Sequence, residues 1–308
     1  MRSFIGAIFV NLLATVPALA CVAATVAPRT EAAPPQPYVL PNTQVRFMQS
    51  QETGADYQLL IATPPGYRTS GKKYPVVYML DADYSFALTR NIVQHFVERR
   101  KLPEMILVGI AYPGAAEDLD IYKRNRTRDY TPALSAAGAT TPTPNVDPER
   151  GGAIRFRNFI ASEIIPYIAT TLPINADRTF IGHSYGGLFG AYVLLTEPEL
   201  FKRYIIVSPS LWYGNRMIFR VEEQTQARRE RDQHIERHAF FAIGSAETRA
   251  ETGAPMVEEL KQFYRKLEAR HDPGLTIDLR VYEGENHSSV FPGAVTRGLL
   301  EVFPTPQS

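Results

Sequence analysis

The sequence is poor in cysteine, since Cys21 is the only one among 308 residues. A single thiol excludes an internal disulfide and a cysteine-rich metal site. An excess of one charge is also lacking, because 33 Lys and Arg stand against 32 Asp and Glu. Such a balance gives no long-range positive field, so we expect no nucleic-acid partner. Metal-ligand spacings and glycine-rich phosphate loops are missing too, and the sequence predicts no metal and no cofactor.

The N-terminal residues carry a short apolar run. It extends from Phe4 to Ala20 after Met1-Arg2 and ends in Ala18-Leu19-Ala20, which is the layout of a secretory signal with an A-x-A cleavage site. Asn11 and Pro17 interrupt this run, which is short for a membrane span. We therefore predict a signal peptide over residues 1–20 and a periplasmic or secreted protein.

Cys21 comes directly after the predicted cleavage site, so a lipoprotein is the alternative. Ala18, however, is a weak match to the leucine that usually lies three residues before a lipidated cysteine. We expect membrane contact only if Cys21 is lipidated or the signal is retained. Residues 21–40, rich in Ala, Pro and Thr, predict a flexible tether, and residues 41–308 predict one folded domain.

Strand-like and helix-like segments alternate along this domain. An N-terminal hairpin is expected at 45–49 and 57–63, and further strands at 76–80, 105–111, 179–182, 203–207, 239–244 and 276–282. Helices are expected near 85–100, 152–170, 187–196, 214–236, 255–270 and 289–302. This alternation predicts an α/β fold with a mostly parallel central sheet and helices on both faces.

The stretch Gly182-His183-Ser184-Tyr185-Gly186 is a G-x-S-x-G pattern between a predicted strand and a predicted helix. In the nucleophile elbow of α/β-hydrolases, a serine occupies the tip of such a turn, and glycines flank it because a Cβ would collide with nearby backbone. We predict Ser184 as a nucleophile, with the amide of Tyr185 as one oxyanion donor. The pattern also occurs by chance, so a base and a carboxylate are required in support.

One of the six histidines stands apart as a candidate base. His287 follows the last predicted strand in the polar loop 283–287, where this fold presents its base. His183 lies inside the elbow, and we expect it to point away from the position of a base.

The carboxylate that orients His287 is expected after strand 239–244, where Glu247 is the first acid. The alternatives are Glu251, Asp278 and Glu283. We expect the second oxyanion donor to be the amide of Asp83, in the loop after strand 76–80. Asp81 and Asp83 are also expected to cap the following helix, and the two roles use different atoms.

Several of these motifs together resemble the putative-esterase branch of the α/β-hydrolases, over residues 46–303. The similarity is carried by residues 79–81, 182–189, 208–212 and 284–287. Within the branch it is nearest the siderophore-esterase-like group, in which the Arg-rich segment 126–132 recurs. The branch includes esterases that open ferric enterobactin, salmochelin and bacillibactin, S-formylglutathione hydrolases and mycolyltransferases.

The resemblance implies an α/β-hydrolase fold and an ester hydrolase with a Ser184–His287 pair. Some members work with serine and histidine alone, so a dyad without Glu247 is the alternative. Ala82 stands where the family usually has glycine, and we expect it to hinder close approach slightly.

Candidate substrate-binding residues lie in two segments. Trp212 and Tyr213 follow a predicted strand and are candidates for stacking on an acyl or aromatic group, with packing of the rim as the alternative. Arg126 and Arg128 are expected in an extended loop, either paired with an anionic substrate such as a ferric catecholate or bound to solvent and backbone.

We therefore predict a serine ester hydrolase that forms an acyl-enzyme and acts on small extracellular esters, with siderophore trilactones as candidates. One alternative is an acyltransferase, which differs only in the nucleophile that receives the acyl group. Another is a catalytically silent binding protein on the same scaffold, because fold does not dictate activity.

Overall fold

The computed structural model describes residues 36–133, 150–225 and 235–304. One compact unit begins at Leu40. The predicted signal peptide, Cys21 and most of the predicted tether lie outside the described residues. Within the described ranges, no helix combines the length and apolar character that a membrane crossing requires.

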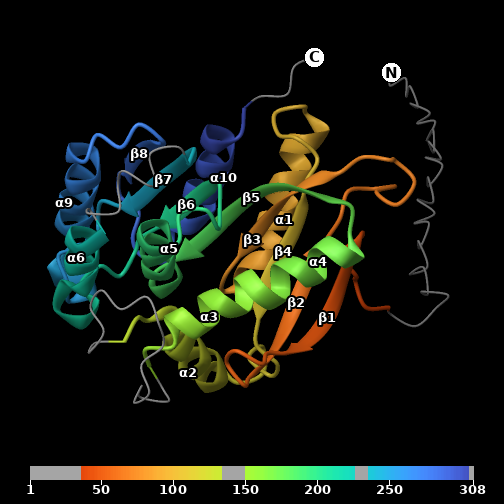
Figure 1. Ribbon diagram of the computed structural model, residues 1–308, viewed down its shortest axis with the longest axis horizontal. Helices are drawn as coiled ribbons and strands as arrows, with labels where there is room; N and C mark the ends of the chain where they lie inside the picture. Colours follow the sequence, from red (N-terminus) through yellow and green to blue (C-terminus); the bar gives the residue numbers. More distant parts are fainter. Residues whose placement is uncertain (1–35, 134–149, 226–234, 305–308) are drawn as a thin grey trace, which may run out of the picture. The chain divides into compact units, whose positions relative to one another are not determined.

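An eight-stranded sheet forms the centre of this unit (Figure 1). Its spatial order is β1-β2-β4-β3-β5-β6-β7-β8. The pairs β1–β2 and β2–β4 are antiparallel, and all other neighbours are parallel. The predicted hairpin, the later strands and the mostly parallel sheet of an α/β-hydrolase are thus confirmed. The strands are β1 (Thr43–Gln49), β2 (Asp56–Ala62), β3 (Tyr74–Met79), β4 (Ile106–Ala111), β5 (Ile174–His183), β6 (Arg203–Val207), β7 (Arg237–Gly244) and β8 (Leu275–Tyr282).

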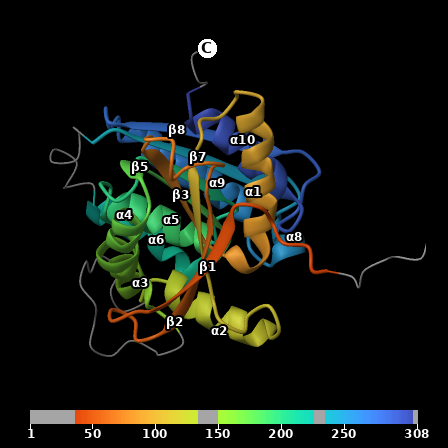
Figure 2. The same ribbon diagram turned by 90° about the vertical axis from the view of Figure 1, so that its right-hand side faces the viewer.

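Helices cover both faces of the sheet, as predicted (Figure 2). On one face, α1 (Ala82–Glu98) and α10 (Val290–Val302) bury apolar side chains against one another and against the strands. The other face is covered by α3 (Ala153–Phe159) with the π-helical turn η2 (Ile160–Ile164) and α4 (Ile165–Thr171), and by α5 (Tyr185–Thr196), α6 (Tyr213–Thr225) and α9 (Met256–Ala269).

Burial on both faces explains the sequence of the central elements. The strands β4 and β6 are buried along their whole length, so β4 is a continuous apolar run, and β6 is one after Arg203. Helix α5 is buried at every position after Tyr185, which accounts for its apolar composition all round. The expected helix 214–236 is described as far as Thr225, and its remainder falls mostly among undescribed residues.

The helix formed by residues 119–130 was not predicted from the sequence. The segment with Arg126 and Arg128, expected to be an extended loop, forms α2 (Leu119–Tyr130), and the side chain of Asp118 caps it by accepting a hydrogen bond from the amide of Asp120. Its charged sequence lacks the apolar stripe by which an amphipathic helix is recognised. Only its last residues, Asp129 and Tyr130, are buried.

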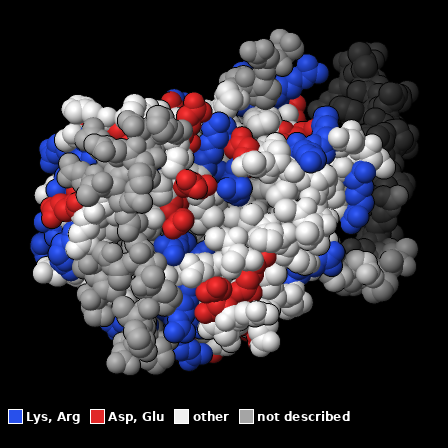
Figure 3. Space-filling view, in the orientation of Figure 1, with Lys and Arg blue, Asp and Glu red and all other residues white. Residues whose placement is uncertain are grey.

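Charges of both signs are mixed over the face of the molecule shown in Figure 3. This distribution agrees with the balanced count of acidic and basic residues. The side chains that carry chemistry instead lie at the carboxyl ends of the parallel strands, where open α/β sheets bind their ligands.

Candidate active site

The elbow between β5 and α5 has the expected strained geometry. Ser184 connects the strand to the helix with φ 59° and ψ −118°, a conformation that L-residues rarely adopt. A Cβ at Gly182 would collide with the carbonyl oxygen of Gly186, so glycine is required there. The amide of Ser184 donates to the carbonyl of Val207 at 3.0 Å, which fastens the turn to the end of β6.

His287 and Glu247 meet across two loops that follow neighbouring strands. His287 Nδ1 lies 2.6 Å from Glu247 Oε2. The other carboxylate oxygen accepts hydrogen bonds from Ser208 Oγ at 2.6 Å and from the Gly244 amide at 2.8 Å. Burial by itself raises the pKa of Glu247, but the hydrogen bonds from His287, Ser208 and Gly244 outweigh it and lower that pKa below its usual value. Glu247 is thus an ionised acceptor for the imidazole.

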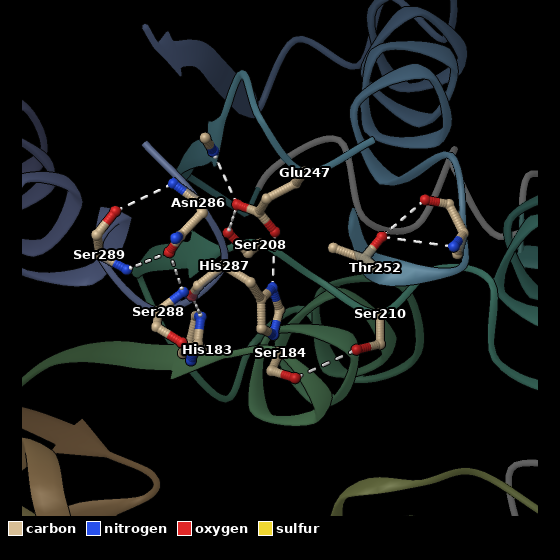
Figure 4. Close-up of polar contacts among 12 residues, drawn as sticks. His183, Ser184, Ser208, Ser210, Glu247, Thr252, Asn286, His287, Ser288 and Ser289 are labelled. Atoms are coloured by element: carbon tan, nitrogen blue, oxygen red, sulfur yellow. Dashed lines mark hydrogen bonds and ion pairs between the residues drawn. The ribbon is translucent and has the colours of Figure 1, made fainter. Parts of the chain in front are cut away.

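Backbone contacts hold these two loops together. The Ala246 amide donates to the carbonyl of Glu285 at 3.1 Å, and a Cβ at Gly244 would collide with that same carbonyl oxygen. On the other side of His287, Asn286 Oδ1 accepts from the amides of Ser288 and Ser289, both at 3.0 Å. Figure 4 shows this arrangement around His287.

Ser184 and His287 line the same cavity, which has a volume of about 300 Å³. The Ser184 hydroxyl lies 3.4 Å from that of Ser210, and Figure 4 shows the edge of the His287 ring that faces away from Glu247 directed at Ser184. The order of groups is therefore serine, imidazole, carboxylate, as nucleophilic catalysis by a hydroxyl requires. The cavity is lined by Ser184, Tyr185, Ser210, Trp212, Glu251, Thr252, Met256 and His287.

The structure identifies which of the candidate acids contacts His287. Glu251 lies in the short helix α8 (Arg249–Thr252) and lines the cavity. Asp278 pairs with His238 at 2.6 Å, and Glu283 is exposed. Of these carboxylates, only Glu247 is within hydrogen-bonding distance of His287 in the described part of the chain.

Both predicted oxyanion donors lie in the first turn of a helix. Tyr185 is the first residue of α5, and Asp83 is the second residue of α1, so their amides belong to the first turn of a helix, which has no intrahelical acceptors. The role of both amides stays a prediction. Ala82 does not obstruct the loop, because its methyl group packs toward Gly109 of β4, where a Cβ would lie only 2.6 Å from it.

The expected capping of α1 by aspartate side chains is wrong for Asp81. The helix begins at Ala82, and Asp81 is its N-cap residue with φ 53° but makes no capping hydrogen bond through its side chain. Its buried carboxylate instead accepts from Tyr122 Oη at 2.9 Å and from Arg126. Asp83 accepts from the amide of Tyr112 at 3.3 Å, and burial raises the pKa of Asp83 to about 6.

Arg126 and Arg128 form ion pairs inside the protein. Arg126 donates to both oxygens of Asp81, at 2.8 and 3.0 Å, and also to the carbonyl of His183 at 3.4 Å. Arg128 makes an equivalent two-pronged pair with Asp129, at 2.7 and 2.8 Å. The prediction that these groups pair with an anionic substrate is at odds with these contacts. Arg126 instead links the loop after β3 to the elbow.

This contact leads to a prediction about stability. The Asp81 side chain is 1% exposed, so Arg126→Met leaves a buried carboxylate without its cationic partner. We expect the free energy of unfolding in urea to fall by about 3–5 kcal/mol. Lys72→Met, which breaks an exposed pair with Glu104, is the control and should change it little. Equal effects of the two substitutions would contradict a structural role for Arg126.

The two predicted aromatic residues have different surroundings. Trp212 is 38% exposed and lines the cavity, with its ring centroid 5.9 Å from that of Tyr185. Tyr213 is only 5% exposed and packs edge-on against Tyr185 at 5.7 Å. Stacking on a substrate remains a prediction for Trp212, which lines the cavity. For Tyr213 the alternative of packing applies, because its ring is buried against Tyr185.

Two serines were missed as members of the site. Ser208 is fully buried beside Glu247, and Ser210 lies beside the nucleophile. The sequence indicates their segment only through the family resemblance, because nothing local in the sequence shows which carboxylate or hydroxyl these two serines contact. Among residues 36–133, 150–225 and 235–304, no three His, Cys, Asp or Glu side chains come together as a candidate metal site.

Comparison with known proteins gives matches over most of the chain. A family model described as a putative esterase matches residues 50–301. The ferri-bacillibactin esterase BesA of Bacillus subtilis is 30% identical over 280 residues, which cover 88% of this chain and 93% of that protein. The siderophore triacetylfusarinine C esterase of Aspergillus fumigatus is 28% identical over 297 residues, 87% of this chain and 96% of that one. The crystal structure of the BES protein from Bacillus cereus matches with a TM-score of 0.74 and 29% identity, over 88% of this chain and 100% of that chain.

Proposed function

The chain belongs to the putative-esterase family and is a serine ester hydrolase, and from these premises we propose that it cleaves siderophore esters through an acyl-enzyme on Ser184. The main support for this mechanism is the contact of 2.6 Å between His287 Nδ1 and Glu247 Oε2. It lies beside Ser184, whose backbone has the strained conformation of a nucleophile elbow. The substrate class is supported by the two relatives, which are esterases of ferri-bacillibactin and of triacetylfusarinine C.

The reaction begins with attack of Ser184 Oγ on the ester carbonyl carbon. His287 Nε2 takes the serine proton, and the carboxylate of Glu247 stabilises the resulting imidazolium. The carbonyl oxygen becomes an oxyanion, for which the amides of Tyr185 and Asp83 are the proposed donors. Collapse breaks the ester C–O bond, and His287 returns the proton to the departing alcohol.

The second half of the reaction releases the acid. A water molecule gives its proton to His287 and attacks the acyl carbon. The second tetrahedral intermediate then collapses to a carboxylic acid as His287 returns that proton to Ser184 Oγ, which restores the free serine. Each ester bond therefore consumes one water and yields one acid and one alcohol. An alcohol in place of water would give acyl transfer, so the two activities differ only in the second nucleophile.

We further propose that the chain acts outside the cytoplasm. The support is the apolar run from Phe4 to Ala20 with its A-x-A site. Fractionation of cells expressing the full-length chain should find the protein in the periplasm or medium, and a chain without residues 1–20 in the cytoplasm. Cytoplasmic retention of the full-length chain would contradict this location.

A substrate panel tests the proposed function. Purified protein is assayed with a ferric catecholate trilactone, a glutathione thioester and p-nitrophenyl butyrate, with and without an added alcohol as acyl acceptor. We expect the highest kcat/KM for the trilactone, with water as the main acceptor. A preference for the glutathione thioester would contradict the substrate class, and a dominant transfer to the alcohol would contradict hydrolysis.

A further inference from the structure

The side chain of His183 lies between α1 and the loop that carries His287. Its Nδ1 is 3.2 Å from the hydroxyl of Tyr84, and its Nε2 is 2.9 Å from the backbone carbonyl oxygen of His287. The residue is 9% exposed. Figure 4 shows it directly beside His287, at the end of β5. His183 thus joins three elements that are far apart in the sequence.

The partners of His183 determine where its proton lies. A carbonyl oxygen can only accept a hydrogen bond, so Nε2 must carry the hydrogen that reaches His287. Nδ1 of a neutral imidazole is then an acceptor, and the Tyr84 hydroxyl donates to it. Burial, reinforced by the positive charge that His287 can carry, lowers the pKa of His183 to about 4. His183 is therefore a neutral Nε2–H tautomer near neutral pH.

The same ring also packs against His287. The two ring centroids are 4.6 Å apart with an angle of 35° between the planes, and Phe291 contacts the His183 ring edge-on at 5.6 Å. His287 is consequently held at three places, namely its Nδ1 by Glu247, its carbonyl by His183 and its ring face by His183. A neutral neighbour suits this place, because a cation there would oppose the imidazolium that forms during the reaction.

We propose that His183 is a positioning residue that fixes the main chain and ring of His287 in the orientation needed for proton transfer with Ser184. This inference rests on the proposed function, in which His287 is the general base. A serine and a base must stay within hydrogen-bonding reach, and small displacements of catalytic groups carry large losses of rate. The bond from His183 restricts the backbone of the base, while Glu247 restricts only its side chain.

Substitution of His183 tests the inference. His183→Phe keeps an aromatic ring but removes the donor to the His287 carbonyl, and it should lower kcat for p-nitrophenyl butyrate about 10- to 100-fold. KM should stay within about twofold, because His183 is not among the residues that line the cavity. His183→Gln offers an amide N–H for the same carbonyl and should recover part of the loss. His95→Phe, on an exposed part of α1, is the matched control and should leave both constants near wild type.

Two results with the substituted proteins would overturn the inference, and one result with the wild-type protein would overturn the proposed function instead. A wild-type kcat in folded His183→Phe would overturn the inference, as would equal losses in the Phe and Gln variants. If wild-type protein itself hydrolyses none of the esters tested, the proposed function fails first, a result that differs from loss of rate in the variants alone. The thermal midpoint of each variant distinguishes a local effect from unfolding.

A spectroscopic measurement on the wild-type protein does not depend on turnover, and folded His183→Gln is used only to assign the signals. In ¹⁵N-histidine-labelled protein, the pair of ring-nitrogen signals that disappears in His183→Gln belongs to His183. We expect a protonated Nε2 and an unprotonated Nδ1, unchanged from pH 8 to pH 5.5. An Nδ1–H tautomer would overturn the inference because its Nε2 has no hydrogen to donate to the His287 carbonyl. Protonation of His183 within that range would overturn it as well, because the ring beside His287 would then be a cation.

Discussion

Ser184→Ala should lower ester turnover by about 10⁴-fold or more and leave the fold intact. The hydroxyl is the proposed nucleophile, and loss of a nucleophile removes the covalent route, so only binding and oxyanion stabilisation contribute to the remaining rate. Alanine at φ 59° is as strained as serine, so the thermal midpoint should change by only a few degrees. The measurement is kcat/KM for p-nitrophenyl butyrate, together with covalent labelling by a fluorophosphonate followed by mass spectrometry.

Ser162→Ala is a matched control on an exposed part of η2, and it should retain both turnover and labelling. The label should map to Ser184 in the wild-type and control proteins and be lost in Ser184→Ala. Turnover that survives in Ser184→Ala at more than about one part in a hundred would show that the esterase activity has another nucleophile.

Glu247→Gln should lower kcat by about 10³- to 10⁴-fold. The carboxylate accepts hydrogen bonds from Ser208, Gly244 and His287, whereas an amide group offers one acceptor and one donor. If the amide oxygen accepts from Ser208 and Gly244, its NH₂ faces His287 Nδ1. The imidazole then carries its hydrogen on Nε2 and cannot accept the proton of Ser184.

The comparison for Glu247→Gln is Glu251→Gln, the same change at a carboxylate that lines the cavity. Glu251→Gln should stay within about tenfold of wild type, because in the described structure it is Glu247 that contacts His287. An equal or larger loss in Glu251→Gln would transfer the acid role to Glu251. Near wild-type turnover in Glu247→Gln would instead indicate a dyad of Ser184 and His287 alone.

Much of the fold was predictable because its signals are local. Buried parallel strands are short and mostly apolar runs. The turn at Ser184 brings backbone atoms together, so it requires glycine at Gly182 and Gly187, where a Cβ would collide with the carbonyl oxygens of Gly186 and Val207. The order of nucleophile, acid and base follows from the order of the strands, so Glu247 and His287 were found by their positions after β7 and β8. The helix α2 escaped prediction because it is held by a cap and a few buried residues rather than by an apolar stripe.

The sequence by itself determined the α/β-hydrolase fold, the elbow at Ser184 and the choice of Glu247 and His287 as candidates, since each depends on neighbours along the chain. The tertiary structure decided what the polar side chains contact. Arg126 binds Asp81, which is 45 residues away, and His183 binds the carbonyl of His287, which is 104 residues away. Such partners are chosen by the desolvation cost of buried charges and by hydrogen-bond geometry, and both exist only after the strands have assembled.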